Sequence, residues 1–469
     1  MIYARGSPIV YDEWAALGNP GWTYENVLPY FRKSEKCNIT GLDPRYHGHE
    51  GYLEIVNVPY ATPLRECFLS AAVELGYNLI DYNTNRTIGF SKFQTTQRNG
   101  RRMSASKAFL RPIGDRTNYY LSKSSRVTKI LIDQENKIAI GVEFVKKGKI
   151  YSVRANKEVI LSAGTLNSPK LLMLSGIGPK KDLQSLGIQV IEDLPVGFNL
   201  QNHVTVQTLS FFINETVGLK EPKTDDYVKY MAYGSGPLTI PGGMEALGFV
   251  STEDWNSTGK PDIELILVLG SVVNDKKGTF RRFFGLSDEF YDSVFSKYQG
   301  SNAFSIFPVL LNPKSRGRVS LRSADPFQEP IFDLNYLDQE DDVKTVVRGI
   351  KKAIQVASTK AFERYNATLV PLSSPACNHT VYLSDAFWNC TARQLTSSMD
   401  HYVGTCSMSP RNKSGVVDHR LHVHGIKSLR VVDNGIIPII TTGHLAAVAY
   451  MIAEKAADMI KEDWKFPMN

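Results

Sequence analysis

The feature that most constrains the fold of this sequence is a short apolar run that passes through a small-residue turn into a helix. Residues 158–161 have the composition of a short strand, and residues 162–165 (Ser-Ala-Gly-Thr) supply the turn. A helix is expected from about Asn167, since Pro169 suits a first helical turn and Gly176 suits the position after the last. Such a turn either brings backbone N–H groups close to an anionic ligand or serves as a structural corner, and the residues leave both interpretations open.

Strands and helices are mixed along the rest of the chain. β-Branched runs at 125–133 and 140–147 predict a hairpin, which a strand at 151–155 continues. Apolar residues repeat at helical spacing over roughly 340–357, and a last helix follows His444. A chain of 469 residues is too long for one simple core, so we expect two closely joined domains of class α/β plus α+β.

Charge and hydropathy exclude two classes of protein. The formal charge of +7 is spread along the chain, and no Lys/Arg block marks a nucleic-acid-binding arm. No apolar run reaches the roughly 18–20 residues that a membrane helix needs. The longest candidate, 445–460, is interrupted by Glu454, Lys455 and Asp458, which predicts a buried amphipathic helix. We therefore expect neither a nucleic-acid partner nor a membrane span.

Sequons and cysteines point to secretion. Eight Asn-X-Ser/Thr sequons exceed the few expected by chance, at Asn38, Asn85, Asn214, Asn256, Asn366, Asn378, Asn389 and Asn412. Cys377 and Cys390 lie in one Asn/Ser/Thr-rich region and could pair. Cys37 could pair with Cys67, and Cys406 is expected to be a buried free thiol. Spacing does not decide the pairing, and fully reduced thiols are the alternative.

Two histidines stand in settings that could support catalysis. His401 lies in Asp-His-Tyr-Val-Gly-Thr-Cys, and His444 follows a segment with Asp433 and Asn434 and directly precedes the last helix. The positive end of that helix disfavours an imidazolium and attracts a developing oxyanion. Either histidine considered alone is more simply a solvated or core residue. The alternating histidines of 418–424 suggest a metal site, but no set of cysteines or carboxylates completes one, so we expect no bound metal.

These segments resemble those of the glucose–methanol–choline (GMC) oxidoreductase family, and the chain is most similar to its insect glucose-dehydrogenase branch. Residues 164–178 fit the second signature of that family without a mismatch. Residues 401–406 resemble its His-Pro-Val-Gly-Thr-Cys segment, and residues 429–455 resemble its closing stretch. Phe198 and Asn202 depart from its Glu-Asn-Leu-Gln-Asp-His pattern by the loss of two carboxylates. The resemblance covers nearly the whole chain.

The resemblance implies a Rossmann-like lobe that binds FAD, joined to a substrate lobe with an antiparallel sheet. Residues 1–205 would form mostly the FAD lobe, 206–395 the substrate lobe, and 396–469 a return to the FAD lobe with the catalytic histidines. Val127 would touch the adenine through its backbone. The residues implied to contact FAD are Val127, Ser162, Ala163, Gly164, Thr165, Asp433, Asn434, His444 and Leu445.

The implied reaction is the oxidation of the CH–OH group of an alcohol or sugar. The substrate hydroxyl would give its proton to a histidine base as a hydride passes to flavin N5. His401 would be the main base, and His444 would hydrogen-bond the substrate oxygen. The electrons would then pass to oxygen or to a quinone. Neither the substrate nor the acceptor is identified by these residues.

One part of the family pattern is missing from the sequence. Family members begin with a strand, a Gly-x-Gly-x-x-Gly turn and a helix that binds the pyrophosphate. That pattern does not occur here, no signal peptide follows Met1, and Met1 stands where the first signature of the family is ending. We expect an active oxidoreductase in which Met1 is an internal methionine; the alternative is a truncated relic or binding protein that cannot hold the flavin. His401 and His444 favour descent from an active enzyme, and the 469 residues alone are expected to bind FAD poorly.

Overall fold

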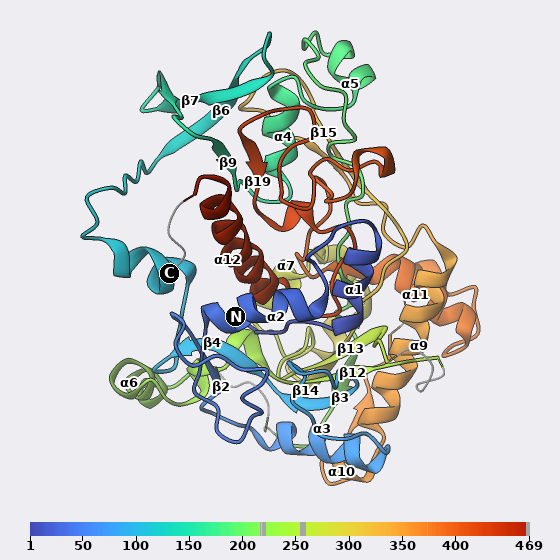
Figure 1. Ribbon diagram of the computed structural model, residues 1–469. Coiled ribbons are helices and arrows are strands. Elements are labelled where there is room, and N and C mark those ends of the chain that lie inside the picture. The colour runs from blue at the N-terminus through green and yellow to red at the C-terminus, as the bar shows by residue number, and fades with distance from the viewer. Residues whose placement is uncertain (216, 218–221, 254–258, 373, 466–469) are drawn as a thin grey trace.

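Two clusters of buried apolar side chains organise the molecule. The computed structural model describes residues 1–215, 217, 222–253, 259–372 and 374–465. One cluster, here called the large-sheet core, surrounds the eight-stranded sheet in the lower part of Figure 1. The other, here called the α12 core, surrounds the last helix, α12 (Leu445–Asp463), in the middle and upper parts of the figure.

The large-sheet core is built on an antiparallel sheet. Its strands are β3 (Gly89–Lys92), β10 (Val204–Val206), β11 (Ser210–Phe212), β12 (Met244–Val250), β13 (Ile263–Val268), β14 (Ala303–Leu310), β17 (Thr368–Leu369) and β18 (Thr396–Ser398). They run in the order β17-β11-β14-β13-β12-β3, while β10 pairs with β14 and β18. Every residue of β13 and β14 is buried, and successive side chains of a strand point to opposite faces. Both faces of the sheet are therefore covered at its centre.

Helices cover this sheet. They are α3 (Pro63–Glu74), α9 (Glu340–Ala357), α10 (Lys360–Glu363) and α11 (Asp385–Leu395). α9 packs on β13 and β14, and α3 packs on β12 and β3. The bounds of α9 match the helix predicted at 340–357, and its buried side includes Val343, Val346 and Ile350. The spacing of apolar residues located this helix correctly, because one stripe of the helix is buried against the sheet.

The α12 core joins segments that are far apart in the sequence. Its elements besides α12 are β6 (Ser125–Asp133), β7 (Ile138–Lys146), β8 (Lys149–Arg154), β9 (Val159–Leu161), α4 (Asn167–Leu174), α5 (Lys180–Ser185) and β19 (Leu429–Val431). β6, β7 and β8 form the predicted hairpin and its continuation, and β9 pairs in parallel with β19. The predicted strand, turn and helix are β9, residues 162–166 and α4. Gly176 follows that helix with a φ of 85°, a conformation that favours glycine.

The N-terminal segment packs against α12. α1 (Pro8–Ala16) is followed by α2 (Tyr24–Ser34), whose N-cap Thr23 accepts a hydrogen bond from the N–H of Asn26. α2 lies against α12 in the middle of Figure 1. A four-stranded sheet follows, with β1 (Glu35–Cys37), β2 (Leu53–Asn57), β4 (Gln94–Arg98) and β5 (Arg101–Arg102). Further elements are α6 (Thr224–Tyr233), α7 (Thr279–Phe283), α8 (Asp288–Val294), β15 (Arg318–Ser320) and β16 (Ile331–Asp333).

A buried network of charges lies beside β1. Nδ1 of His47 is 3.0 Å from Oε1 of Glu35, and Nε2 of His47 is 2.8 Å from Oδ2 of Asp81. Arg5 donates to Glu35 at 2.6 Å. Burial lowers the pKa of His47, but its hydrogen bonds to Asp81, Cys37 and Glu35 outweigh burial and raise the pKa to about 11. Glu35, Cys37 and His47 place potential metal-ligand atoms within 4.8 Å of one another, yet Arg5 and protonated His47 already balance the two carboxylates.

Two of the three predictions about the cysteines are confirmed. Cys377 and Cys390 form a disulfide with their Cα atoms 5.8 Å apart, and Cys406 is a free buried thiol. The pairing of Cys37 with Cys67 is wrong, because both thiols are free and buried. α3 carries Cys67 into the large-sheet core, whereas Cys37 ends β1 beside His47.

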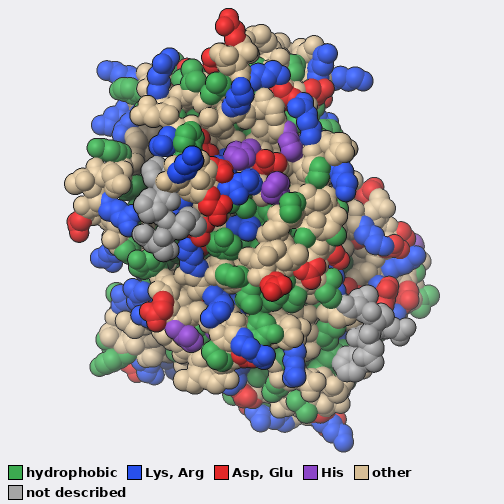
Figure 2. Space-filling view, in the orientation of Figure 1, with side chains coloured by type: hydrophobic (Ala, Val, Ile, Leu, Met, Phe, Trp, Pro, Cys, Tyr) green, Lys and Arg blue, Asp and Glu red, His purple; other side chains and the backbone are tan. Residues whose placement is uncertain are grey.

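The surface carries no strong separation of charge on the side shown in Figure 2. Lys and Arg side chains are interspersed there with Asp and Glu side chains. Among the described residues, none of the helices combines the length and the apolar character needed to cross a membrane. Neither observation identifies a partner of this protein.

Candidate active site

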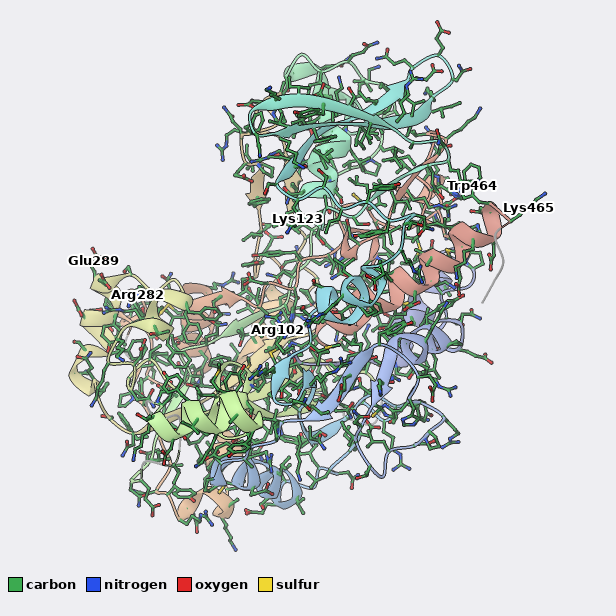
Figure 3. The ribbon with its side chains drawn as sticks, turned by 90° about the vertical axis from the view of Figure 1, so that its left-hand side faces the viewer. Arg102, Lys123, Arg282, Glu289, Trp464 and Lys465 are labelled. Atoms are coloured by element: carbon green, nitrogen blue, oxygen red, sulfur yellow. A yellow bond between two sulfur atoms is a disulfide. The ribbon has the colours of Figure 1, made fainter. Side chains whose placement is uncertain are left out.

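His401 and His444 come together at a cavity of about 470 Å³, here called the histidine cavity. The cavity lies where the turn after β9, the loop around His401 and the start of α12 meet. Met1 also lines it, and the carbonyl of Met1 accepts a hydrogen bond from the N–H of Thr96 on β4. Figure 3 shows Arg102, on the adjacent strand β5, between the upper body with β6–β8 and the lower body with α7 and α8. The histidine cavity is therefore near the junction of the two bodies.

Four side chains form a row along this junction. The rings of His401 and His444 are centred 4.9 Å apart and inclined at 83°. Nε2 of His444 lies 3.1 Å from Oε1 of Glu264 on β13. Nδ1 of His401 lies 2.9 Å from Nδ1 of His203, the residue before β10. The order Glu264, His444, His401, His203 thus runs from the buried centre of the large sheet past the cavity.

Burial and neighbouring histidines keep His401 neutral. The pKa of His401 lies well below its ordinary value, first because the ring is desolvated, then because His444 and His203 would repel a second positive charge. Burial, followed by the same effect of His444, lowers the pKa of His203 to about 3. A neutral imidazole keeps one nitrogen lone pair. His401 can therefore accept a proton at neutral pH.

Neither Glu264 nor His203 is predicted from the sequence as a site residue. Glu264 does carry a signal, because it is the one charged residue in the apolar run 263–268. A carboxylate inside a fully buried strand needs a hydrogen-bond partner, and the partner here is His444. His203 belongs to the same family motif as Asn202, and nothing near it in the chain points to His401.

Asp433 hydrogen-bonds both the turn after β9 and the turn after β19, in which it lies. Its Oδ2 accepts hydrogen bonds from the N–H of Gly164 at 3.0 Å and the hydroxyl of Ser168 at 2.6 Å, and its Oδ1 accepts from the N–H of Gly435 at 2.7 Å. Burial raises the pKa of this carboxyl, and these hydrogen bonds oppose the rise. Protein donors therefore occupy both oxygens, and Asp433 lies behind the histidine cavity instead of lining it.

A second cavity of about 650 Å³ continues from the first and is here called the Val127 cavity. Ala163 and Asn167 line both cavities. Of the predicted FAD contacts, Ala163, Gly164, Thr165, Asn434, His444 and Leu445 line the histidine cavity, and Val127, Ser162 and Ala163 line the Val127 cavity. Every predicted contact except Asp433 therefore borders the space formed by these two adjoining cavities.

Two features of that space suit a long ligand with polar groups. The Oδ1 atom of Asn434 is buried and has no hydrogen-bond partner among the residues described. A side chain at Gly164 would meet no atom of the described chain within 4 Å, so the backbone there is open to a ligand. A two-part space with one unused acceptor and an accessible glycine fits a dinucleotide.

Two protein-family models match this chain. The N-terminal GMC oxidoreductase family model matches residues 1–205, and the C-terminal GMC oxidoreductase model matches residues 313–453. The chain belongs to the GMC oxidoreductase family. The resemblance drawn from the sequence and the predicted class, mixed α/β with an antiparallel sheet, are both confirmed.

Named GMC relatives cover nearly the whole chain. A glucose dehydrogenase (FAD, quinone) of Drosophila melanogaster is 39% identical over 470 residues, which are 99% of this chain and 72% of the relative. An ecdysone oxidase of Bombyx mori is 36% identical over 99% of this chain and 68% of the relative. A variant of the Aspergillus oryzae formate oxidase, studied for FAD modification, superposes with a TM-score of 0.86 at 27% identity, covering 99% of this chain and 82% of that one. An FAD-dependent oxidoreductase from Chaetomium thermophilum gives a TM-score of 0.84 at 26% identity, covering 100% and 85%.

Proposed function

We propose that this GMC family chain oxidises the CH–OH group of an alcohol or sugar with FAD as its cofactor. Membership of the family and the names of its relatives support the reaction class. The observation that carries the proposal is a neutral His401 on the border of a cavity, next to His444. A proton acceptor and a hydrogen-bond donor side by side are what the removal of a hydroxyl proton requires.

The two cavities would hold FAD between them. Val127 and Ser162 would hold the adenine end, and residues 163–165 with Asn434 and Leu445 would hold the flavin end. The unused Oδ1 of Asn434 and the open side of Gly164 support this fit. When bound, FAD supplies the acceptor for the hydrogen and electron pair that leave the substrate carbon.

The histidines would divide the proton chemistry between them. His401 would take the hydroxyl proton, because its ring is neutral and borders the cavity. Oε1 of Glu264 lies 3.1 Å from Nε2 of His444 and would hold this ring in place beside His401. His444 would hydrogen-bond the substrate oxygen beside His401 and stabilise the charge that develops there.

Two successive measurements, flavin binding and then turnover, test the proposal. The purified protein is mixed with FAD, freed of unbound flavin by gel filtration and examined for flavin absorbance. Glucose, ecdysone and simple alcohols are then offered with oxygen or a quinone as the acceptor. In protein that retains flavin, His401→Ala should hold as much flavin as wild type and lose about 10²–10⁴-fold in turnover. The control is His424→Ala, which should behave as wild type, because the His424 ring contacts the carbonyl of Ser409 outside the cavity. Normal turnover in His401→Ala would refute the base role of His401.

A second candidate function is that of a binding protein derived from such an enzyme. Among the described residues, β9 pairs only with β19, and Ile160 in this strand is 46% exposed. Ile160 lines the Val127 cavity, and an apolar wall left this open would enclose a planar ligand incompletely. A protein that binds sugars or alcohols in calorimetry but retains no flavin after gel filtration would favour this candidate.

We also propose that the protein is secreted and glycosylated. Its disulfide and its exposed sequons support secretion, and the exposed asparagines are Asn38, Asn85, Asn214, Asn366, Asn378 and Asn412. Asn256 lies outside the described residues. A shift in electrophoretic mobility after enzymatic removal of N-glycans tests this proposal. The domain division into 1–205, 206–395 and 396–469 is likewise proposed, with the two separate cores as its support.

A further inference from the structure

A third pocket, of about 440 Å³, lies outside the two cavities described above and is here called the basic pocket. Five cationic side chains line it, and among the described residues no acidic side chain does. The five are Arg98, Arg101, Arg102, Lys107 and Arg111. The basic pocket shares no lining residue with the histidine cavity or the Val127 cavity, so it is a separate feature of the surface. Figure 3 shows one of its residues, Arg102, between the upper and lower bodies.

The first wall of the basic pocket is the tight hairpin of β4 and β5. Arg98 and Arg101 are directly opposite each other in the register of the two strands. The two residues between them, Asn99 and Gly100, have φ angles of 49° and 68°, and positive φ at both positions is what a two-residue hairpin turn of this kind requires. Like charges opposite each other on neighbouring strands repel, so this arrangement destabilises the hairpin.

The second wall is a single π-helical turn over Ser106–Leu110, which continues into a 3₁₀ turn over Arg111–Ile113. Lys107 and Arg111 are four residues apart, a spacing that puts two side chains on the same side of a helical segment. Like charges at this spacing also repel each other. Single π-helical turns are uncommon, and they occur frequently at functional sites. Two pairs of like charges therefore face one pocket, which favours a role in binding an anion.

The end of α6 closes the basic pocket and holds it in shape. A Cβ on Gly100 would overlap the carbonyl oxygen of Gly234, and a Cβ on Gly234 would overlap that of Asn99. Because both residues are glycine, the hairpin and the end of the helix are in direct backbone contact. Arg101 donates to the carbonyl of Met231 in α6 at 2.6 Å. This contact orients the guanidinium group and leaves its charge in place.

Most of the positive charge in the basic pocket is not neutralised. Arg98 is the exception, because it pairs with Glu54 at 2.6 Å. Lys107 donates to the backbone carbonyl of Arg102 at 3.2 Å, which again leaves the charge in place. The side chains of Arg102 and Arg111 are exposed, and neither makes a hydrogen bond or an ion pair with the described chain. Four of the five cations are therefore available to a ligand.

We propose that the basic pocket binds a ligand that carries two or more sulfate or phosphate groups. Four cations without acidic partners around one pocket attract more than one negative charge. Three of the four are arginines, whose planar guanidinium groups donate paired hydrogen bonds to the oxygens of such anions. An anion between the cations also offsets their mutual repulsion. Binding here requires neither flavin nor turnover, so the inference is independent of the proposed function.

The anionic groups have two sources of the same chemistry, a sulfated sugar chain and a phosphate ester. Tyr233, which lines the basic pocket, is 76% exposed and offers an apolar ring face to a sugar unit. A tetrasaccharide derived from heparin represents the first source, and inorganic tripolyphosphate represents the second. The probe that binds more tightly identifies the source.

Isothermal titration calorimetry of the whole protein at an ionic strength of about 0.15 M measures the binding of both probes. We expect at least one probe to bind at a single site. The double variant Arg102→Gln/Arg111→Gln should bind it on the order of 10–100-fold more weakly, because each arginine supplies charge-assisted hydrogen bonds. The control Arg282→Gln/Arg322→Gln removes the same charge from two exposed arginines outside the pocket and should bind as wild type. Figure 3 shows Arg282 well apart from Arg102.

Four results would overturn the inference. Neither probe binds the wild-type protein, or Arg102→Gln/Arg111→Gln binds as tightly as wild type. Equal losses in the two double variants would attribute binding to the net charge of the protein and not to the pocket. Displacement of the probe by FAD would assign the probe to the flavin site. If Arg102→Gln/Arg111→Gln does not fold, the two single variants decide by the same comparison.

Discussion

Replacing His47 with alanine should destabilise the folded protein, and most strongly at acidic pH. The His47 side chain is 1% exposed and lies between Glu35 and Asp81. In the variant, Glu35 keeps its ion pair with Arg5, and Asp81 keeps a hydrogen bond from the N–H of Asn83. The buried carboxylates then outnumber the buried cations.

The size of the loss follows from the burial of this network. Removing one partner of a buried ion pair costs about 3–5 kcal/mol in the free energy of unfolding. Arg5 and the N–H of Asn83 remain in place, which favours the lower end, about 3 kcal/mol. With an unfolding entropy of about 2 cal/mol/K per residue, this corresponds to a fall of about 3 °C in the melting temperature of a 469-residue chain.

The pH dependence has a definite sign. The pKa of His47 is about 11 in the folded protein and about 6.5 when unfolded. Below about pH 6.5 both states bind the proton, so the stabilisation by His47 is fully present. Between about pH 6.5 and pH 11 only the folded state keeps the proton, so this contribution declines as the pH rises.

Urea unfolding followed by tryptophan fluorescence measures this contribution. The difference in unfolding free energy between wild type and His47→Ala should shrink as pH rises from about 6 to about 9, within the window set by the two pKa values. His49→Ala is the matched control, because His49 is exposed and its ring meets only the carbonyl of Cys37 among the contacts described. A difference that stays constant across this range would refute the reasoning.

Three further substitutions test other parts of the structure. Glu264→Gln should weaken the contact with Nε2 of His444. A loss of about 1–2 kcal/mol would lower kcat/KM of flavin-loaded protein roughly 5–30-fold, and an unchanged kcat/KM would show that Glu264 does not support His444. Asp433→Asn places an amide donor against the N–H groups of the two turns and should lower the unfolding free energy by about 1–3 kcal/mol together with FAD affinity, as urea unfolding and flavin titration would show. Serine at both Cys377 and Cys390 should cost about 3 kcal/mol, and reduced wild type should then unfold at the same urea concentration as the double variant.

Several local elements of this protein were predictable from residues near one another in the chain. The helix α9, the hairpin of β6 and β7, and the turn from β9 into α4 all occur where the sequence predicts them. Apolar periodicity and capping residues act within a few residues of chain, so they are visible without the fold. The disulfide of Cys377 with Cys390 spans a separation of 13 residues and was also predicted. The pairing of Cys37 with Cys67 failed because the two residues belong to different parts of the fold.

The candidate site was predictable only in part. His401 and His444 stand in distinctive motifs, which is why they were identified and why their proximity was expected. Glu264 and His203 reach their histidine partners across 180 and 198 residues of chain. No local pattern encodes a contact of that separation, because it depends on how the large sheet packs against the α12 core.

By itself, the sequence determined the family, the class of the fold, the principal helices and the histidine pair. Each of these follows from local patterns or from motifs. The tertiary structure alone decided what surrounds that pair. Packing put Glu264 against His444 and His203 against His401, and it turned Asp433 toward the two turns instead of the cavity. A buried polar group must find its partner in space rather than along the chain, and the side chains that contact this pair come from segments that meet only after folding.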